Sequence, residues 1–90
     1  MKVIKIGAVW CSDCVIMRPR WQEIEKENPW LKTEYLEYDD NKAEADKYLG
    51  EAKDIPLFVF LDKDGMVLEK LRGAVSKEIL LEKINTYKNK

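Results

Sequence analysis

The 90-residue chain contains no histidine. This absence excludes, within one chain, a cysteine–histidine nucleophile pair, a catalytic triad and zinc sites that combine cysteine with histidine. Long apolar runs are also missing, so we expect no segment that spans a bilayer. The first residues, Met1 to Lys5, lack the long apolar run and cleavage site of a secretory signal. The sequence therefore predicts a cytoplasmic protein that makes no membrane contact.

An excess of charge of either sign is lacking as well. Sixteen Lys and Arg side chains face seventeen Asp and Glu side chains, which gives a net charge of -1. This balance offers no reason to expect nucleic acid or an acidic membrane surface as a partner. A hydrophobic share of 46% is typical of a globular protein. The length then suits a single domain over residues 1–90, which we expect to be a monomer.

The alternation of apolar patterns and turn residues predicts the element order β-α-β-α-β-β-α. The expected strands are residues 3–9, 33–39, 57–61 and 66–71, and the first and last expected helices are residues 11–28 and 76–87. A short helix between them is expected to be capped by Asp40 or Asn41 and ended by Gly50. The first crossovers should be right-handed, with the first strands parallel. We therefore expect an α/β fold with a four-stranded mixed sheet and helices on both faces. The inward face of the first helix is predicted to carry Val15, Ile16, Met17, Trp21 and Ile24.

Both cysteines of the chain lie in Trp10-Cys11-Ser12-Asp13-Cys14, at the predicted junction of the first strand and helix. The free N–H groups and the dipole of a helix N-terminus favour a thiolate, which is the attacking species in thiol–disulfide exchange. Cys14 lies one turn further along the same helix, where it can resolve a mixed disulfide without large backbone movement. We therefore interpret Cys11 as the nucleophile and Cys14 as the resolving thiol.

Three other interpretations of the cysteine pair remain open from the residues alone. The two thiols could be small core residues, could bind a soft metal such as Cu(I), or could serve a redox-sensing adaptor. Small copper carriers usually have a methionine near the first cysteine and the order βαββαβ, whereas Trp10 stands here. Zinc would require two further ligands. We therefore favour redox chemistry and expect no metal site.

The motifs along the chain resemble those of the thioredoxin family. Trp10-Cys11-Ser12-Asp13-Cys14 matches the family's Trp-Cys-x-x-Cys, and Pro19 lies where the family has a helix-kinking proline. Ile55-Pro56 with the following LFVFLDKDG matches the family's Ile-Pro, strand and turn, and residues 72–76 (RGAVS) resemble its Gly-Ala stretch. The resemblance covers nearly the whole chain. The chain resembles a compact version of the thioredoxin fold, which lacks the extra N-terminal strand and helix.

This resemblance implies a thiol–disulfide oxidoreductase, or protein-disulfide reductase, that acts on disulfide-containing proteins. A reductase such as a thioredoxin reductase, or a thiol, would reset the cysteine pair, and no bound cofactor would be needed. The resemblance further implies that the peptide bond before Pro56 is cis and lies against the cysteines. Ile55 and Pro56 would bind the extended chain of the substrate. By the same matching, Trp10, Gly73 and Ala74 would line the substrate groove.

The chain departs from the family pattern at three positions that are expected to tune the redox chemistry. Ser12 and Asp13 stand where thioredoxins typically have Gly-Pro, and the Asp13 carboxylate should oppose a nearby thiolate. Lys5 stands where the family has a buried aspartate that assists proton transfer. Strand parity suggests Glu37 as the partner of Lys5. These departures leave open whether the protein is a reductant, an isomerase or an oxidant.

Overall fold

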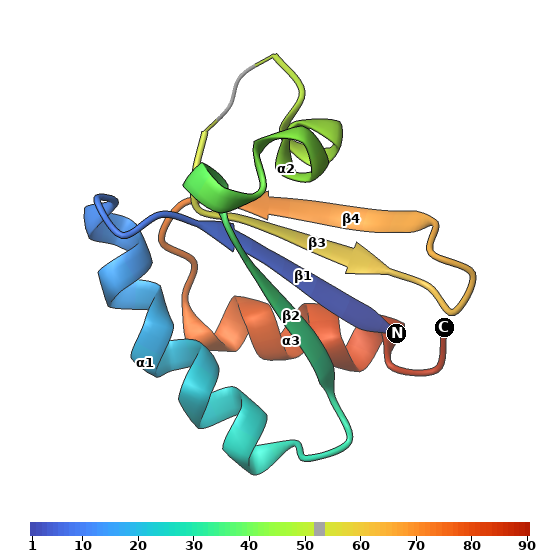
Figure 1. Cartoon of the computed structure of the whole chain (residues 1–90). Helices are drawn as coiled ribbons and strands as arrows, with labels where there is room; N and C mark the ends of the chain where they lie inside the picture. Colours follow the sequence, from blue (N-terminus) through green and yellow to red (C-terminus); the bar gives the residue numbers. More distant parts are fainter. Residues whose placement is uncertain (52–53) are drawn as a thin grey trace.

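The computed structural model describes residues 1–51 and 54–90. Its elements are, in chain order, β1 (Lys2–Gly7), α1 (Ser12–Glu27), β2 (Lys32–Glu37), the short 3-10 helix η1 (Tyr38–Asp40), α2 (Lys42–Leu49), β3 (Leu57–Leu61), β4 (Val67–Arg72) and α3 (Lys77–Tyr87). The order of the strands and α-helices confirms the prediction (Figure 1). The 3-10 helix η1 was not predicted. None of the described helices is long and apolar enough to cross a membrane.

The four strands form one mixed sheet in the order β2-β1-β3-β4. Strand β1 pairs parallel with β2 and antiparallel with β3, and β3 pairs antiparallel with β4. In the register of β1 with β2, Lys5 lies opposite Tyr35 and Gly7 lies opposite Glu37. The mixed sheet confirms the predicted architecture, and its register decides which side chains meet near the end of β1.

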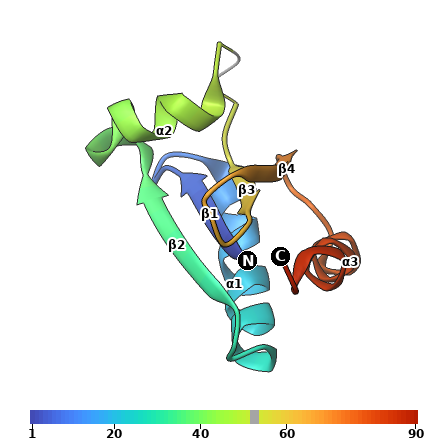
Figure 2. The same ribbon diagram turned by 90° about the vertical axis from the view of Figure 1, so that its right-hand side faces the viewer.

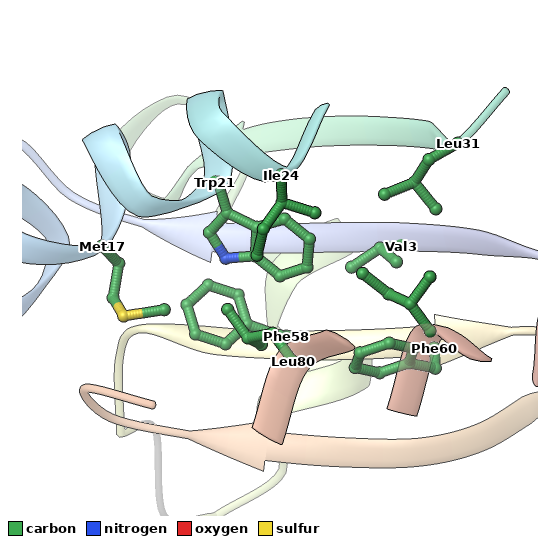
Figure 3. Packing of buried hydrophobic residues seen from close by; sticks show 9 residues of the cluster. Val3, Met17, Trp21, Ile24, Leu31, Phe58, Phe60 and Leu80 are labelled. Carbon is green, nitrogen blue, oxygen red and sulfur yellow. The ribbon is translucent and has the colours of Figure 1, made fainter. Parts of the chain in front are cut away.

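Helices cover both faces of the sheet, as predicted: α1 and α3 lie on one face and α2 on the other (Figures 1 and 2). Successive residues of a strand point to opposite faces, so Val3 packs under α1 and α3, whereas Ile4 packs under α2. All five residues of the inner strand β3 are buried. On the α1 side, the rings of Trp21 and Phe58 pack at a tilt of 56°, with their centroids 5.4 Å apart (Figure 3).

The buried face of α1 differs from the predicted one. Its buried residues are Cys14, Met17, Trp21 and Ile24, which follow one another at the three- and four-residue spacing of a helix face. The prediction that Val15 and Ile16 belong to this face is wrong, because they are 53% and 48% exposed. Cys14 takes the core position instead. The resolving thiol is therefore part of the packed face of α1.

The ends of the first two strands also fall short of their predictions. Strand β1 ends at Gly7, and β2 ends at Glu37 because η1 follows directly. Residues 8–10 therefore form a loop between β1 and α1, in which Val9 is 73% exposed. The carboxyl ends of these two parallel strands meet at one edge of the sheet, which places this loop next to η1 (Figure 1).

Candidate active site

Cys11 is the N-cap residue of α1. Its backbone is extended (φ -90°, ψ 117°), and its Sγ accepts a hydrogen bond from the backbone N–H of Cys14 at 3.3 Å. In most helices an oxygen of Ser, Thr, Asp or Asn fills this role. A thiolate is a better acceptor than a thiol, and the helix N-terminus favours negative charge. The local geometry therefore directs a backbone N–H of the helix N-terminus at the Cys11 sulfur.

Cys14 is a buried thiol with different properties. It is 7% exposed, and it packs with Ala8 and Cys11 in a small cluster against Tyr38 and Ile55. Both cysteines are free. Burial raises the pKa of the Cys14 thiol to about 12, and the sulfur of Cys11 adds to the increase. Cys14 therefore holds its proton at neutral pH and must lose it before it can act as a nucleophile.

The peptide bond between Ile55 and Pro56 is cis, which confirms the expectation from the resemblance. The carbonyl of Ile55 accepts a hydrogen bond from the Cys11 thiol at 3.8 Å, so the proline segment lies against the cysteine pair as expected. The buried Pro56 accepts a hydrogen bond through its carbonyl from Gly73 N–H at 2.9 Å. Gly73 has φ 81°, a conformation that favours glycine. The structure thus brings together five predicted site residues, namely Cys11, Cys14, Ile55, Pro56 and Gly73.

Trp10 and Ala74 border this centre at the surface. Trp10 is 63% exposed, and its Nε1–H donates a hydrogen bond to Asp39 Oδ2 at 3.0 Å. Asp39 was not singled out from the sequence. The parallel pairing of the first two strands could have suggested it, because Asp39 follows one strand as Trp10 follows the other. Ala74 and Ser12 are exposed, and Asp13 is half-buried in the first turn of α1.

A pair of contacts that the sequence did not indicate fixes the segment after Gly73 to α1. Arg20 donates a hydrogen bond to the carbonyl of Val75 at 2.7 Å. The N–H of Val75 in turn donates to the Sδ of Met17 at 3.3 Å. Since Gly73 is itself tied to Pro56, these contacts connect the proline segment with the helix that carries both cysteines.

The expected pairing of Lys5 with Glu37 is wrong. Lys5 Nζ forms an ion pair of 2.7 Å with Glu25 of α1, and it also lies 5.7 Å from the centroid of the Trp21 ring. Strand parity takes only the neighbouring strand into account. On that strand Tyr35 lies opposite Lys5, and Glu37 lies two residues further along, opposite Gly7. Helix α1 covers this face of the sheet and brings Glu25 to Lys5. The carboxylate that balances the charge of the Lys5 ammonium thus comes from α1 and not from the neighbouring strand.

Glu37 lies instead beside the cysteine pair. Its carboxylate accepts hydrogen bonds from Val9 N–H at 3.1 Å and from the Tyr35 hydroxyl at 2.8 Å. A Cβ on Gly7 would lie 3.0 Å from Cys14 Sγ and 3.2 Å from Tyr35 Oη. Both atoms therefore lie close to the backbone of Gly7, where a larger residue would crowd them. Burial, the hydrogen bond to Glu37 and its charge raise the pKa of Tyr35. Sequence reasoning missed Tyr35 entirely.

A cavity of about 290 Å³ lies beside Cys14, between α1 and the sheet. Its lining includes Lys5, Gly7, Cys14, Trp21, Tyr35 and Pro56. The buried Nε1–H of Trp21 has no hydrogen-bond partner among the described residues. Within residues 1–51 and 54–90, no three acidic or cysteine side chains gather closely enough to hold a metal ion. The cavity connects the resolving thiol with the Lys5–Glu25 pair.

Comparison with known proteins supports this assignment of the site. A family model described as Thioredoxin matches residues 1–79. The chain is 38% identical over 85 residues to an H-type thioredoxin of Fagopyrum esculentum, covering 94% of this chain and 70% of that protein. It is 36% identical over 90 residues to the chloroplastic thioredoxin F of Oryza sativa subsp. japonica, covering 97% of this chain and 45% of that protein.

The fold agrees with the same assignment. The X-ray structure of Fasciola hepatica thioredoxin superimposes with a TM-score of 0.84 at 30% identity, and the match covers 96% of this chain and 79% of that one. The matched region includes both cysteines in the family model. The chain therefore belongs to the thioredoxin family, and Cys11 and Cys14 form the cysteine pair of a thiol–disulfide oxidoreductase.

Proposed function

We propose that this chain exchanges its dithiol with disulfides in extended segments of other proteins, with Cys11 as the nucleophile and Cys14 as the resolving thiol. The observation that carries this proposal is the position of the Cys11 sulfur. It caps α1 through the N–H of Cys14 and lies 3.8 Å from the carbonyl of Ile55, beside the cis proline. The sulfur is thus placed between a helix N-terminus and a backbone segment that a substrate can pair with.

In the first step, the Cys11 thiolate attacks one sulfur of a substrate disulfide. The substrate S–S bond breaks, a mixed disulfide forms with Cys11, and the other substrate sulfur leaves with the electron pair and takes up a proton. The N–H of Cys14 at the start of α1 donates a hydrogen bond to the attacking sulfur. Cys11 is only 8% exposed, so the substrate must present its disulfide closely to this edge of the sheet.

In the second step, Cys14 loses its proton and attacks Cys11 Sγ. The Cys11–Cys14 disulfide forms, the mixed disulfide breaks, and the second substrate thiol is released. Cys14 is already close, because its backbone N–H contacts the sulfur that it attacks. Two electrons have then passed from the dithiol to the substrate.

The substrate groove is proposed to run along Ile55 and Pro56. An extended substrate chain would pair with the backbone of Ile55, in the manner of an added strand. Trp10 would border this groove on one side, and Gly73 and Ala74 on the other. The exposed Val9 and Trp10 provide apolar surface for contact with a substrate.

Family membership implies protein substrates and a reductase that resets the disulfide. We propose a thioredoxin reductase or a small thiol as the electron donor, and a single domain over residues 1–90 that acts as a monomer in the cytoplasm. One relative is a chloroplastic thioredoxin F, so an organelle location is the outcome that would contradict this proposal. Fractionation of the source cells with an antibody against the chain would locate it.

An insulin reduction assay tests the proposed function. The wild type should precipitate insulin in the presence of a thiol donor, and Cys14→Ser should instead accumulate a mixed disulfide with insulin through Cys11. Cys11→Ser is the matched control and should form no mixed disulfide. A wild type that reduces no disulfide but binds Cu(I) tightly would contradict the proposal and support a metal carrier.

A further inference from the structure

We propose that Tyr35 and Glu37 of β2 form a proton relay for the resolving thiol, in which the Glu37 carboxylate is the base and the Tyr35 hydroxyl passes the proton. This inference rests on the proposed exchange reaction, whose second step requires Cys14 as a thiolate. It assigns a catalytic role to two residues that come from a different strand than the one on which the resemblance places a buried aspartate.

The need for a base follows from the environment of Cys14. This thiol is buried, and its raised pKa leaves a very small fraction of thiolate at neutral pH. Cys11 differs, because its sulfur accepts a helix N–H directly. The second step would therefore be slow unless a nearby group accepts the Cys14 proton as the new bond forms.

The geometry brings such a group to Cys14. A Cβ on Gly7 would lie 3.0 Å from Cys14 Sγ and 3.2 Å from Tyr35 Oη, so the two atoms approach the same part of the β1 backbone, where only glycine leaves room for both. Tyr35 donates its hydroxyl proton to Glu37 at 2.8 Å. In the proposed relay, a proton passes from the Cys14 sulfur to the Tyr35 oxygen through one bridging water, while the Tyr35 proton passes to Glu37.

The other groups around Cys14 are less suited to accept its proton. On α1, Cys11 is itself a reacting sulfur, and Arg18 on the cavity wall is a cation. On β1, Lys5 lines the same cavity, but it is an ammonium paired with Glu25. From η1, Tyr38 packs against the cysteine cluster and directs its hydroxyl to Asp46 at 3.4 Å.

The Glu37 carboxylate is different, because it accepts hydrogen bonds from two neutral donors, Val9 N–H and the Tyr35 hydroxyl. Its negative charge is close enough to oppose a negative charge on Cys14, and it contributes to the raised pKa of that thiol. Transfer of the proton to Glu37 removes this repulsion at the moment when the Cys14 thiolate forms. A carboxylate that only repelled the thiolate would instead impede the second step.

The proposed step is balanced. The Cys14 proton moves to the Tyr35 oxygen as the Tyr35 proton moves to Glu37, and the Cys14 thiolate attacks Cys11 Sγ. The Cys11–Cys14 bond forms, the bond between Cys11 and the substrate sulfur breaks, and the substrate sulfur leaves with the electron pair and is protonated by water. Glu37, which is partly exposed, then returns its proton to solvent.

Stopped-flow reaction of the reduced protein with 5,5′-dithiobis(2-nitrobenzoate) separates the two steps. The first equivalent of released thionitrobenzoate reports attack by Cys11, and the second reports attack by Cys14 on the mixed disulfide. Tyr35→Phe and Glu37→Gln should each slow the second phase about tenfold or more at neutral pH and leave the first phase within about twofold. The wild-type second phase should vary little with pH near neutrality, whereas both variants should speed up with rising pH.

Glu34→Gln is the matched control, because Glu34 lies on the same strand and pairs with Lys2 at the surface. It should behave as the wild type in both phases. An unchanged second phase in Tyr35→Phe or Glu37→Gln would overturn the relay, as would a faster one in Glu37→Gln, which would mean that the carboxylate only repels the thiolate. A wild type without a first phase would instead contradict the assignment of Cys11 as the nucleophile. Tyr35 is 47% exposed, so its substitution should not prevent folding.

Discussion

The Cys11 sulfur and the backbone N–H of Cys14 are joined by a hydrogen bond of 3.3 Å, so the attacking atom is also the cap of α1. The start of the helix and the reactivity of the site therefore depend on the same interaction. When Cys11 becomes part of a mixed disulfide, its sulfur is a weaker acceptor than a thiolate, so the hydrogen bond from the Cys14 N–H becomes weaker. This hydrogen bond therefore weakens at the stage when Cys14 has to move toward Cys11.

Substitution of Cys11 should separate capping from catalysis. Cys11→Ser abolishes disulfide exchange but keeps an N-cap acceptor, so the free energy of unfolding of the reduced protein should stay near the wild-type value. Cys11→Ala removes the acceptor and should cost about 1 kcal/mol. Urea unfolding followed by circular dichroism measures both values. Equal stability of the serine and alanine variants would show that the sulfur does not cap the helix.

Gly7→Ala should impair the second step more than the first. The added Cβ would lie 3.0 Å from Cys14 Sγ and 3.2 Å from Tyr35 Oη, which is too close for either atom to keep its position. We expect a loss of about 1–3 kcal/mol in the free energy of unfolding and a slower release of the second thionitrobenzoate, with the first phase retained. Gly50→Ala is a useful control, because no atom lies within 4 Å of a Cβ there.

The control also separates crowding from backbone strain. Gly50 has φ 69°, so its replacement strains the backbone but leaves the active site untouched. It should lower stability without changing either phase of the reaction. If Gly7→Ala and Gly50→Ala affected the second phase equally, the space beside Cys14 would have no specific role.

The ion pair between Lys5 and Glu25 should contribute more to stability than the one between Lys2 and Glu34. Both pairs are 2.7 Å long, but the Lys5 side chain is 16% exposed and that of Lys2 is 45% exposed. Double-mutant cycles with Lys→Met and Glu→Gln should give a coupling energy of about 1 kcal/mol or more for the first pair and a few tenths for the second. Similar values would mean that α1 does not shield the Lys5 pair from solvent.

Those features that depend on local pattern could be predicted from the sequence. The run of five apolar residues predicts β3 with its observed bounds, Leu57–Leu61, because no polar residue interrupts it. The sequence also predicts that the last helix starts at Ser76, and the Ser76 hydroxyl accepts a hydrogen bond from Ile79 N–H at 3.3 Å. The cis bond before Pro56 was expected from the resemblance, which rests on the residues around it.

Contacts that depend on how layers pack could not be predicted in the same way. The partner of Lys5 is decided by where α1 crosses the sheet, and strand parity carries no information about that. The approach of Tyr35 to Cys14 depends on Gly7 of the neighbouring strand, because glycine has no side chain to separate them. Each of these contacts joins residues from different elements, and each needs the register and the helix position together.

Alkaline pH should destabilise the reduced protein through Cys14. Burial raises the pKa of this thiol from its ordinary value of 9.0 to about 12 in the folded state, so the folded protein retains a proton that the unfolded chain releases. The associated stability is fully present below about pH 9 and is lost as the pH rises toward 12, at a rate on the order of 1 kcal/mol per pH unit. Urea unfolding of the reduced wild type at several pH values measures this loss.

Cys14→Ala supplies the comparison, since it removes the titrating thiol and keeps the rest of the site. The difference in free energy of unfolding between wild type and Cys14→Ala should shift against the wild type above about pH 9. Tyr35 has a raised pKa as well, so it contributes in the same direction, and Tyr35→Phe should reduce the remaining slope. Parallel pH profiles for wild type and Cys14→Ala would mean that burial does not hold the proton on Cys14, and the need for a base in the second step would disappear with it.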